Sequence, residues 1–130
     1  MSDAPLPVHF AGMPIFTKTM DFLEWLIPRT NDFPRLHRHT ITRRLLDSTL
    51  DFLDRLLEAN NLRKEERLER LERADGSLDR LRHYLRLTRS LRWLTPSQYQ
   101  HASRAVAEIG RLLGGWIKTT QAQIEAGEMS

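Results

Sequence analysis

From residue 14 onward, apolar residues recur at helical spacing, and no segment shows the sustained apolar–polar alternation of a β-strand. The pattern is broken at "TNDFPR" (30–35), at "ANN" (59–61) and at "TP" (95–96), and each of these breaks consists of turn-forming residues. Four helices are therefore expected, near residues 14–28, 36–60, 63–94 and 96–126. Short connections and wide apolar faces predict an all-α, antiparallel up-down four-helix bundle.

On each helix the apolar residues form a stripe that should face the core of the bundle. A second row of leucines on the helix over 36–60 predicts burial against more than one neighbour: Leu46, Leu50, Leu53 and Leu57. The stripes expected to face inward are Phe16, Met20, Leu23 and Ile27; Ile41, Leu45, Thr49, Phe52 and Leu56; Leu71, Ala74, Leu78, Leu81, Leu85, Thr88 and Leu91; and Tyr99, Ala102, Val106, Ile109, Leu113, Trp116, Thr120 and Ile124.

Local signals set the expected helix ends. Thr95 followed by Pro96 is an N-cap threonine with proline at the first helical position. Pro28 should end or kink the first helix, and "ADGS" (74–77) is a weak point in the third. Prolines and a glycine before residue 14 predict a flexible tail over 1–13. The expected organisation is this tail, one bundle over 14–126 and a short C-terminal tail over 127–130.

Composition excludes several classes of protein. The 130 residues suffice for one domain, and the absence of cysteine excludes disulfides and thiolate metal sites. No apolar run reaches the roughly 20 residues that a membrane-spanning helix needs. The N-terminus lacks the basic region and the apolar segment of a signal peptide, so a cytoplasmic protein without a membrane partner is expected.

Enzymatic and metal chemistry find little support. An acidic row on the second helix (Asp47, Asp51, Asp54 and Glu58) could suggest a di-metal site, but the inward Glu-x-x-His pairs of such bundles are missing. A solvated face with salt bridges to arginine explains the row better. The five histidines show no ligand spacing, and no nucleophile or phosphate-binding glycine loop is recognisable. We expect no catalytic residue, no metal and no cofactor.

The basic residues are unusual in type and position. Seventeen of the 20 are arginine, which offers forked donors for phosphate and carboxylate, although a GC-rich genome would give the same bias. Residues 33–46 and 80–107 contain no acidic residue. These windows predict contact with an anionic partner, above all a nucleic-acid backbone, or else pairing with the acidic row within or between subunits. The first window holds Arg35, Arg38, Arg43 and Arg44, and the second holds an exposed stripe of Arg82, Arg86 and Arg89, followed by Arg104.

Three glycines interrupt the fourth helix in "EIGRLLGGWIK" (108–118), although glycine costs roughly 1 kcal/mol in a helix interior. Gly110 and Gly114 share a face and predict a close approach of another helix, in the core or at a subunit interface. Gly115 falls in an exposed polar stripe with Arg111 and Lys118, where a kink or a partner close to the backbone would explain it. Trp116 is expected to be a bulky inward anchor.

Three segments resemble the accessory variability determinant (Avd) of diversity-generating retroelements, a family related to four-helix proteins encoded in ribosomal-RNA intervening sequences. They are "FPR" (33–35), "LRHYLRLTRSLRWLTPSQY" (81–99) and "EIGRLLGGWIK" (108–118). The resemblance implies a homopentameric ring with a basic surface, which associates with the retroelement's reverse transcriptase and template RNA and has no catalytic activity of its own. The positions that match the family are Phe33, Pro34, Arg35, Arg82, Arg86, Arg89, Trp93, Gly110, Gly114, Gly115 and Trp116.

The resulting hypothesis is a non-catalytic adaptor that binds reverse transcriptase and nucleic acid, RNA or DNA, and supports mutagenic retrohoming. The alternative is a structural bundle of the intervening-sequence type with no link to reverse transcription. The candidate packing or interface residues are Phe33, Pro34, Trp93, Gly110, Gly114, Gly115 and Trp116. The candidate binding residues are Arg35, Arg38, Arg43, Arg44, Arg82, Arg86, Arg89, Arg104, Arg111 and Lys118.

Overall fold

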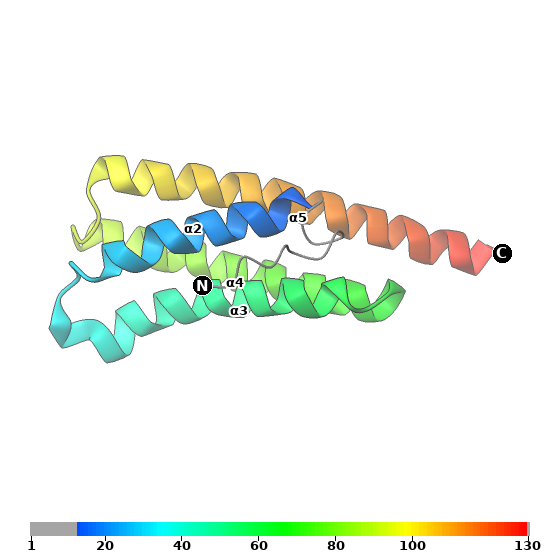
Figure 1. The fold of residues 1–130 in the computed structure, drawn as a ribbon, viewed down its shortest axis with the longest axis horizontal. Helices are drawn as coiled ribbons and strands as arrows, with labels where there is room; N and C mark the ends of the chain where they lie inside the picture. Colours follow the sequence, from blue (N-terminus) through cyan, green and yellow to red (C-terminus); the bar gives the residue numbers. More distant parts are fainter. Residues whose placement is uncertain (1–12, 130) are drawn as a thin grey trace, which may run out of the picture.

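The computed structural model describes residues 13–129, so residues 1–12 of the expected N-terminal tail lie outside the described part. Within that part the chain forms four long helices and no strand, which confirms the predicted all-α bundle (Figure 1). A 3₁₀ turn and a π turn lie between the first two long helices. In chain order the elements are α2 (Pro14–Thr30), η1 (Arg35–His37), η2 (Arg38–Thr42), α3 (Arg43–Asn60), α4 (Lys64–Ser90) and α5 (Pro96–Met129).

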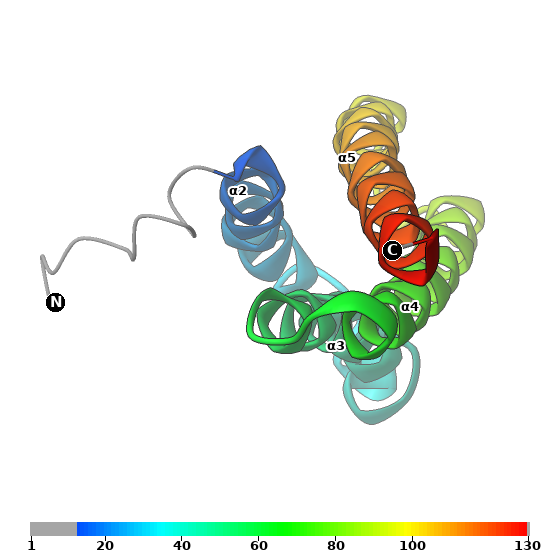
Figure 2. The same cartoon turned by 90° about the vertical axis from the view of Figure 1, so that its right-hand side faces the viewer.

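The helices run up and down. α3 packs along α4, α4 packs along α5, and α2 lies against both α5 and α3, as the view along the bundle shows (Figure 2). α5 is the longest, with 34 residues or about 50 Å, and its C-terminal turns extend beyond the other helices (Figure 1). It continues to Met129, so residues 127–129 belong to this helix rather than to a separate tail.

The core consists of one apolar cluster. Its fully buried members come from all four helices, and the buried threonines of these four helices donate hydrogen bonds to carbonyls one turn earlier in the same helix. Thr19 Oγ1 bonds to Ile15 O at 2.7 Å, and Thr88 Oγ1 bonds to Leu85 O at 2.9 Å. Such hydroxyls can be buried without the desolvation cost of an unpaired group. The largest apolar side chains of the core are Phe16, Leu26, Leu45, Phe52, Leu56, Leu71, Leu78, Leu81, Ile109 and Leu113.

Most predicted helix ends are confirmed. Gln98 N donates to Thr95 Oγ1 at 3.1 Å, and Thr95 N donates to Gln98 Oε1 at 3.0 Å, a capping box before Pro96. Pro28 lies inside the last turn of α2, which ends two residues later at Thr30. The expected weak point at 74–77 is wrong: α4 runs through Gly76 without a break.

Some stripe positions predicted to be buried are exposed. Met20 and Ile27 on α2 are 39% and 44% exposed, because α3 contacts this side of α2 only partly. Leu50 and Leu57 on α3 are similarly exposed, so α2, the second neighbour of α3, covers this leucine row only in part. Leu91 is 43% exposed because α4 ends at Ser90 and the chain turns away from the core.

Candidate nucleic-acid interface

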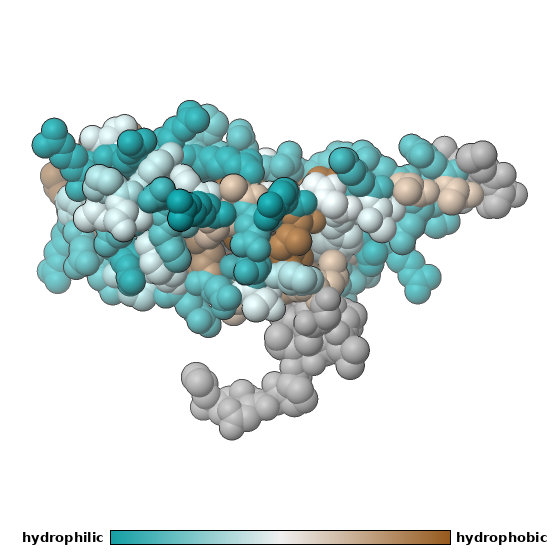
Figure 3. Space-filling model, turned by 90° about the horizontal axis from the view of Figure 1, so that it is seen from above, coloured by the Kyte–Doolittle hydropathy of each residue, from teal (hydrophilic) through white to brown (hydrophobic). Residues whose placement is uncertain are grey.

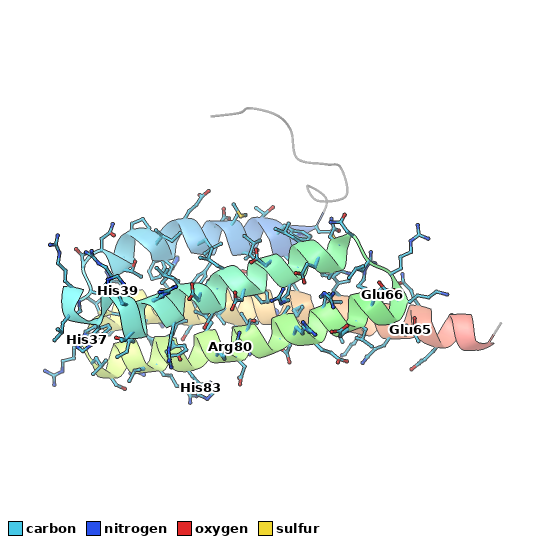
Figure 4. The ribbon with its side chains drawn as sticks, turned by 90° about the horizontal axis from the view of Figure 1, so that it is seen from below. His37, His39, Glu65, Glu66, Arg80 and His83 are labelled. Atoms are coloured by element: carbon cyan, nitrogen blue, oxygen red, sulfur yellow. The ribbon has the colours of Figure 1, made fainter. Side chains whose placement is uncertain are left out.

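The up-down topology brings both acid-free windows to the same end of the bundle. Residues 33–46 connect α2 to α3, and residues 80–107 contain the end of α4, the next turn and the start of α5. Figure 4 shows His37 and His39 at this end, whereas Glu65 and Glu66 lie at the opposite end of the bundle. The bundle therefore has a basic end, defined here by residues 33–46 and 80–107.

Three of the four residues of the acidic row on α3 are paired with arginine, as predicted for a solvated face with salt bridges. Asp51 Oδ2 lies 3.6 Å from Arg80 Nη2. Glu58 Oε1 accepts a hydrogen bond from Arg55 Nη1 at 2.7 Å, and Glu58 Oε2 lies 3.0 Å from Arg70 Nε in an ion pair. Asp47 lies 3.7 Å from Arg43. Most arginines of the basic end remain unpaired: within the described residues no ion pair is formed by Arg35, Arg38, Arg44, Arg82, Arg86, Arg89, Arg92 or Arg104.

Part of this free positive charge lines a groove between α4 and α5. The groove has a volume of about 480 Å³ and is lined by Arg82 and Arg86 from α4 and by Arg111 from α5. The guanidinium of Arg89 lies over the ring of Tyr99, 4.8 Å from its centroid, and Tyr99 also lines the groove. Cationic side chains on two antiparallel helices thus face one open channel without a carboxylate in its lining. We refer to it as the α4–α5 groove.

The glycines of α5 have different surroundings. A Cβ added to Gly110 would lie 2.5 Å from Arg82 Nη2, so this glycine makes room for the guanidinium against the helix. A Cβ at Gly114 or Gly115 would meet nothing within 4 Å, so the close helix approach expected at Gly114 does not occur within the described chain. α5 continues straight through these residues as helix, without the break considered for Gly115.

Gly115 borders a small apolar groove between the start of α2 and α5. Its other lining residues include Ile15, Leu112 and Trp116. Figure 3 shows a hydrophobic area at this place on a largely hydrophilic face. Trp116 is half-buried: its ring meets Phe16 edge-on at 5.9 Å and is covered by Arg67 at 5.7 Å. Gly115 therefore lies beside apolar side chains as well as within the exposed polar stripe.

The "FPR" and Trp93 segments pack together at the tip of the basic end. Phe33 is buried, and its ring lies 5.3 Å from that of Trp93. His37 stacks on Trp93 at 5.4 Å, and Pro34 is exposed directly before η1. The turn before η1 is thus anchored to the α4–α5 turn.

Other candidate residues lie apart. Arg104 lines a different groove between α2 and α5, where Lys18 and Glu108 form a 3.4 Å ion pair. Lys118 is exposed on the C-terminal half of α5, outside the basic end. Arg44 is exposed on α3 and lines none of these grooves. The ten candidate binding residues therefore do not form one continuous site.

Two further observations concern other classes of function. Among residues 13–129, no group of three or more histidine or carboxylate side chains is arranged to hold a metal ion. None of the helices in this part of the chain combines the length and apolar character needed to cross a membrane.

Comparison with known proteins decides the family. A sequence model of the bAvd-like family matches residues 13–120. The chain belongs to the bAvd-like family. This is an Avd-type accessory protein family, as the three segments predicted. The fold also resembles a crystal structure from the S23 ribosomal protein family, a protein of unknown function from Bacteroides thetaiotaomicron VPI-5482. The TM-score is 0.73 at 18% identity, over 81% of this chain and 96% of that one. No curated protein matches the chain.

Sequence reasoning missed several residues that shape the grooves of this bAvd-like protein. Tyr99 was expected only as a core residue, yet its ring lies under the guanidinium of Arg89 at the edge of the α4–α5 groove. Thr42 was not singled out because nothing in "HTITRR" (39–44) indicates the π turn in which it lies. The lack of acid in residues 33–46 and the "FPR" segment (33–35) mark that region in the sequence, but neither points to Thr42.

Proposed function

We propose that this bAvd-like chain is a non-catalytic accessory protein of a diversity-generating retroelement. It binds the reverse transcriptase and nucleic acid, template RNA or cDNA, and supports mutagenic retrohoming. The observation that carries the nucleic-acid part is the α4–α5 groove, where Arg82, Arg86 and Arg111 face one channel without an acidic partner in the described chain.

The chemistry of this groove suits phosphate. Arginine forks bind phosphate oxygens in pairs, and each phosphate neutralised releases condensed counterions from the nucleic acid. Such contacts position a strand without reading its sequence. Tyr99, which could stack on a base, is already covered by Arg89 at 4.8 Å. Binding through this groove is therefore governed by charge, and it weakens steeply as salt rises.

The second part of the proposal is that the chain assembles into a homopentamer, as the family resemblance implies. It is supported by large apolar side chains left exposed on the α2–α3 side: Met20, Ile27, Leu50 and Leu57. Gly114 and Gly115 add bare backbone that another chain could approach closely. Light scattering of purified protein at micromolar concentration should give a mass of five chains. A monomer at that concentration would contradict this part.

Co-purification tests the link to reverse transcription. The chain carries an affinity tag and is co-expressed with the reverse transcriptase of its own retroelement and the template RNA. We expect both to be retained at low salt, and the RNA to be lost first as salt rises. Retention of RNA without the enzyme, in a host that expresses both, would favour the alternative of a structural bundle of the intervening-sequence type. The fold shared with the S23 family protein is what supports that alternative.

A further inference from the structure

A second groove at the basic end lies between α2 and the start of α3. It has a volume of about 620 Å³, within the range of roughly 300–1,000 Å³ of small-ligand pockets, and shares no lining residue with the α4–α5 groove. Its lining includes Arg35, Arg38 and Arg43 against one carboxylate, Asp47. Three positive charges and one negative charge leave a net charge of +2, and His39 also lines the groove.

The three arginines are available to a ligand. Arg35 and Arg38 are exposed and form no ion pair within the described residues. Arg43 Nε lies 3.7 Å from Asp47 Oδ2, but both side chains are more than half exposed, 68% and 56%. Exposed pairs of this kind contribute little to stability, so a stronger anion can compete with the carboxylate.

Thr42 gives an independent sign of a ligand. It lines the same groove and is only 7% exposed, yet its Oγ1 has no hydrogen-bond partner among the described residues. The buried hydroxyls of Thr19 and Thr49, by contrast, bond to carbonyls in their own helices. A buried donor without a partner is costly, and a ligand oxygen in the groove would satisfy it.

The backbone brings these groups together. η2 is a π turn that carries Arg38 and Thr42, and Arg43 follows it as the first residue of α3, so that all three line the groove. Turns of this type are frequent at functional sites. The preceding loop is fixed by Phe33, which is buried against Trp93. The groove is thus held in place before any ligand binds.

We infer that this groove is a phosphate-binding site, separate from the α4–α5 groove. Arg35, Arg38 and Arg43 supply charge and forked donors, and the Thr42 hydroxyl donates to a phosphate oxygen. A phosphate at the end of a strand is a phosphomonoester with about −1.5 to −2 charges, which matches the groove better than a single carboxylate or the singly charged phosphodiester within a strand does. The inference rests on the nucleic-acid part of the proposed function, because the phosphate belongs to an RNA strand, within it or at its end.

Line broadening of inorganic phosphate in ³¹P NMR, at fixed ionic strength, tests the site. The wild-type chain should broaden the signal, and Arg38→Gln and Thr42→Val should each weaken phosphate binding about tenfold, as expected for a lost charge-assisted hydrogen bond. Matched controls are Arg63→Gln, an exposed arginine outside the groove and outside the basic end, and Thr49→Val, a buried threonine with a partner. Both should behave as wild type. Equal broadening by all variants would overturn the inference.

Thermal unfolding separates binding from folding. Thr42→Val removes an unpaired buried hydroxyl, so its melting temperature without phosphate should equal or exceed that of the wild type. A clear fall in melting temperature would show that the hydroxyl has a structural role and would count against the site.

Two RNAs of one sequence, with a 5′-phosphate or a 5′-hydroxyl and a 3′ label, identify the source of the phosphate. A preference for the 5′-phosphate that disappears in Arg38→Gln assigns a strand end, and equal losses for both RNAs assign an internal phosphodiester. If Arg38→Gln weakens neither RNA more than Arg63→Gln does, the inference fails while the proposed function stands. Failure of the proposed function differs, because the wild type would then bind neither RNA at low salt.

Discussion

The bare pair Gly114–Gly115 allows a direct test of what the glycines of α5 contribute. Both lie in helix interior, no described glycine has positive φ, and a Cβ at either position meets nothing within 4 Å. Alanine therefore fits without strain and should stabilise the helix by roughly 1 kcal/mol at each position. The double variant Gly114→Ala/Gly115→Ala should gain about 2 kcal/mol.

The corresponding thermal shift follows from chain length. Unfolding entropy near 2.1 cal/mol/K per residue gives about 0.27 kcal/mol/K for 130 residues, so about 2 kcal/mol raises the melting temperature by about 7 °C. Gly76→Ala is the matched control, because Gly76 is also helical with open space around its Cβ. It should raise the melting temperature by about half as much.

Circular dichroism melts at several protein concentrations, with light scattering, distinguish fold from assembly. We expect the double variant to melt higher than wild type at low concentration but to assemble less well, whereas Gly76→Ala assembles normally. A lower melting temperature at low concentration, with Gly76→Ala still stabilised, would refute the reasoning, because it would require a close contact inside the chain that the structure does not contain.

Three further substitutions test local features. Thr95→Ala removes the capping box with Gln98 and should cost about 1 kcal/mol in urea unfolding; an unchanged midpoint would refute the cap. Gly110→Ala should not destabilise the chain, since only the flexible end of Arg82 must move; a loss above about 1 kcal/mol in the same assay would contradict this. Trp93→Ala should lower the free energy of unfolding by about 2–3 kcal/mol, less than the roughly 3–5 kcal/mol lost with a fully buried aromatic. Calorimetry that shows no loss would mean that the ring does not pack against Phe33.

The fold was predictable because local signals and periodicity agree. Thr95 and Pro96 fixed the start of α5, and the stripe from Leu71 to Thr88 is buried as expected. The misplaced positions, Met20 and Ile27, depend on how far two helices separate, which apolar spacing on one helix does not encode. An apolar stripe predicts which face of a helix tends to be buried, but not whether the same chain covers that face.

The grooves were less predictable than the charge that lines them. The lack of acid around Arg38 and Arg86 is visible in the sequence, and so is the potential for phosphate binding. That the two windows share one end follows only once the up-down connections are known. The π turn, the unpaired hydroxyl of Thr42 and the approach of Arg82 to Gly110 depend on side-chain positions within a few ångströms, for which helical periodicity gives no rule.

The salt dependence of RNA binding tests the central claim, that the basic end binds the phosphate backbone. For single strands the slope of log K against log[salt] is about −0.7 per phosphate neutralised, so replacing Arg82, Arg86 and Arg89 by glutamine should make it shallower by about 2. The control is a triple variant with equal charge loss, in which glutamine replaces the exposed residues Arg63, Lys64 and Arg73. These residues lie at the opposite end of α4, so this variant should keep the wild-type slope. Equal slopes for the two triple variants would contradict the claim.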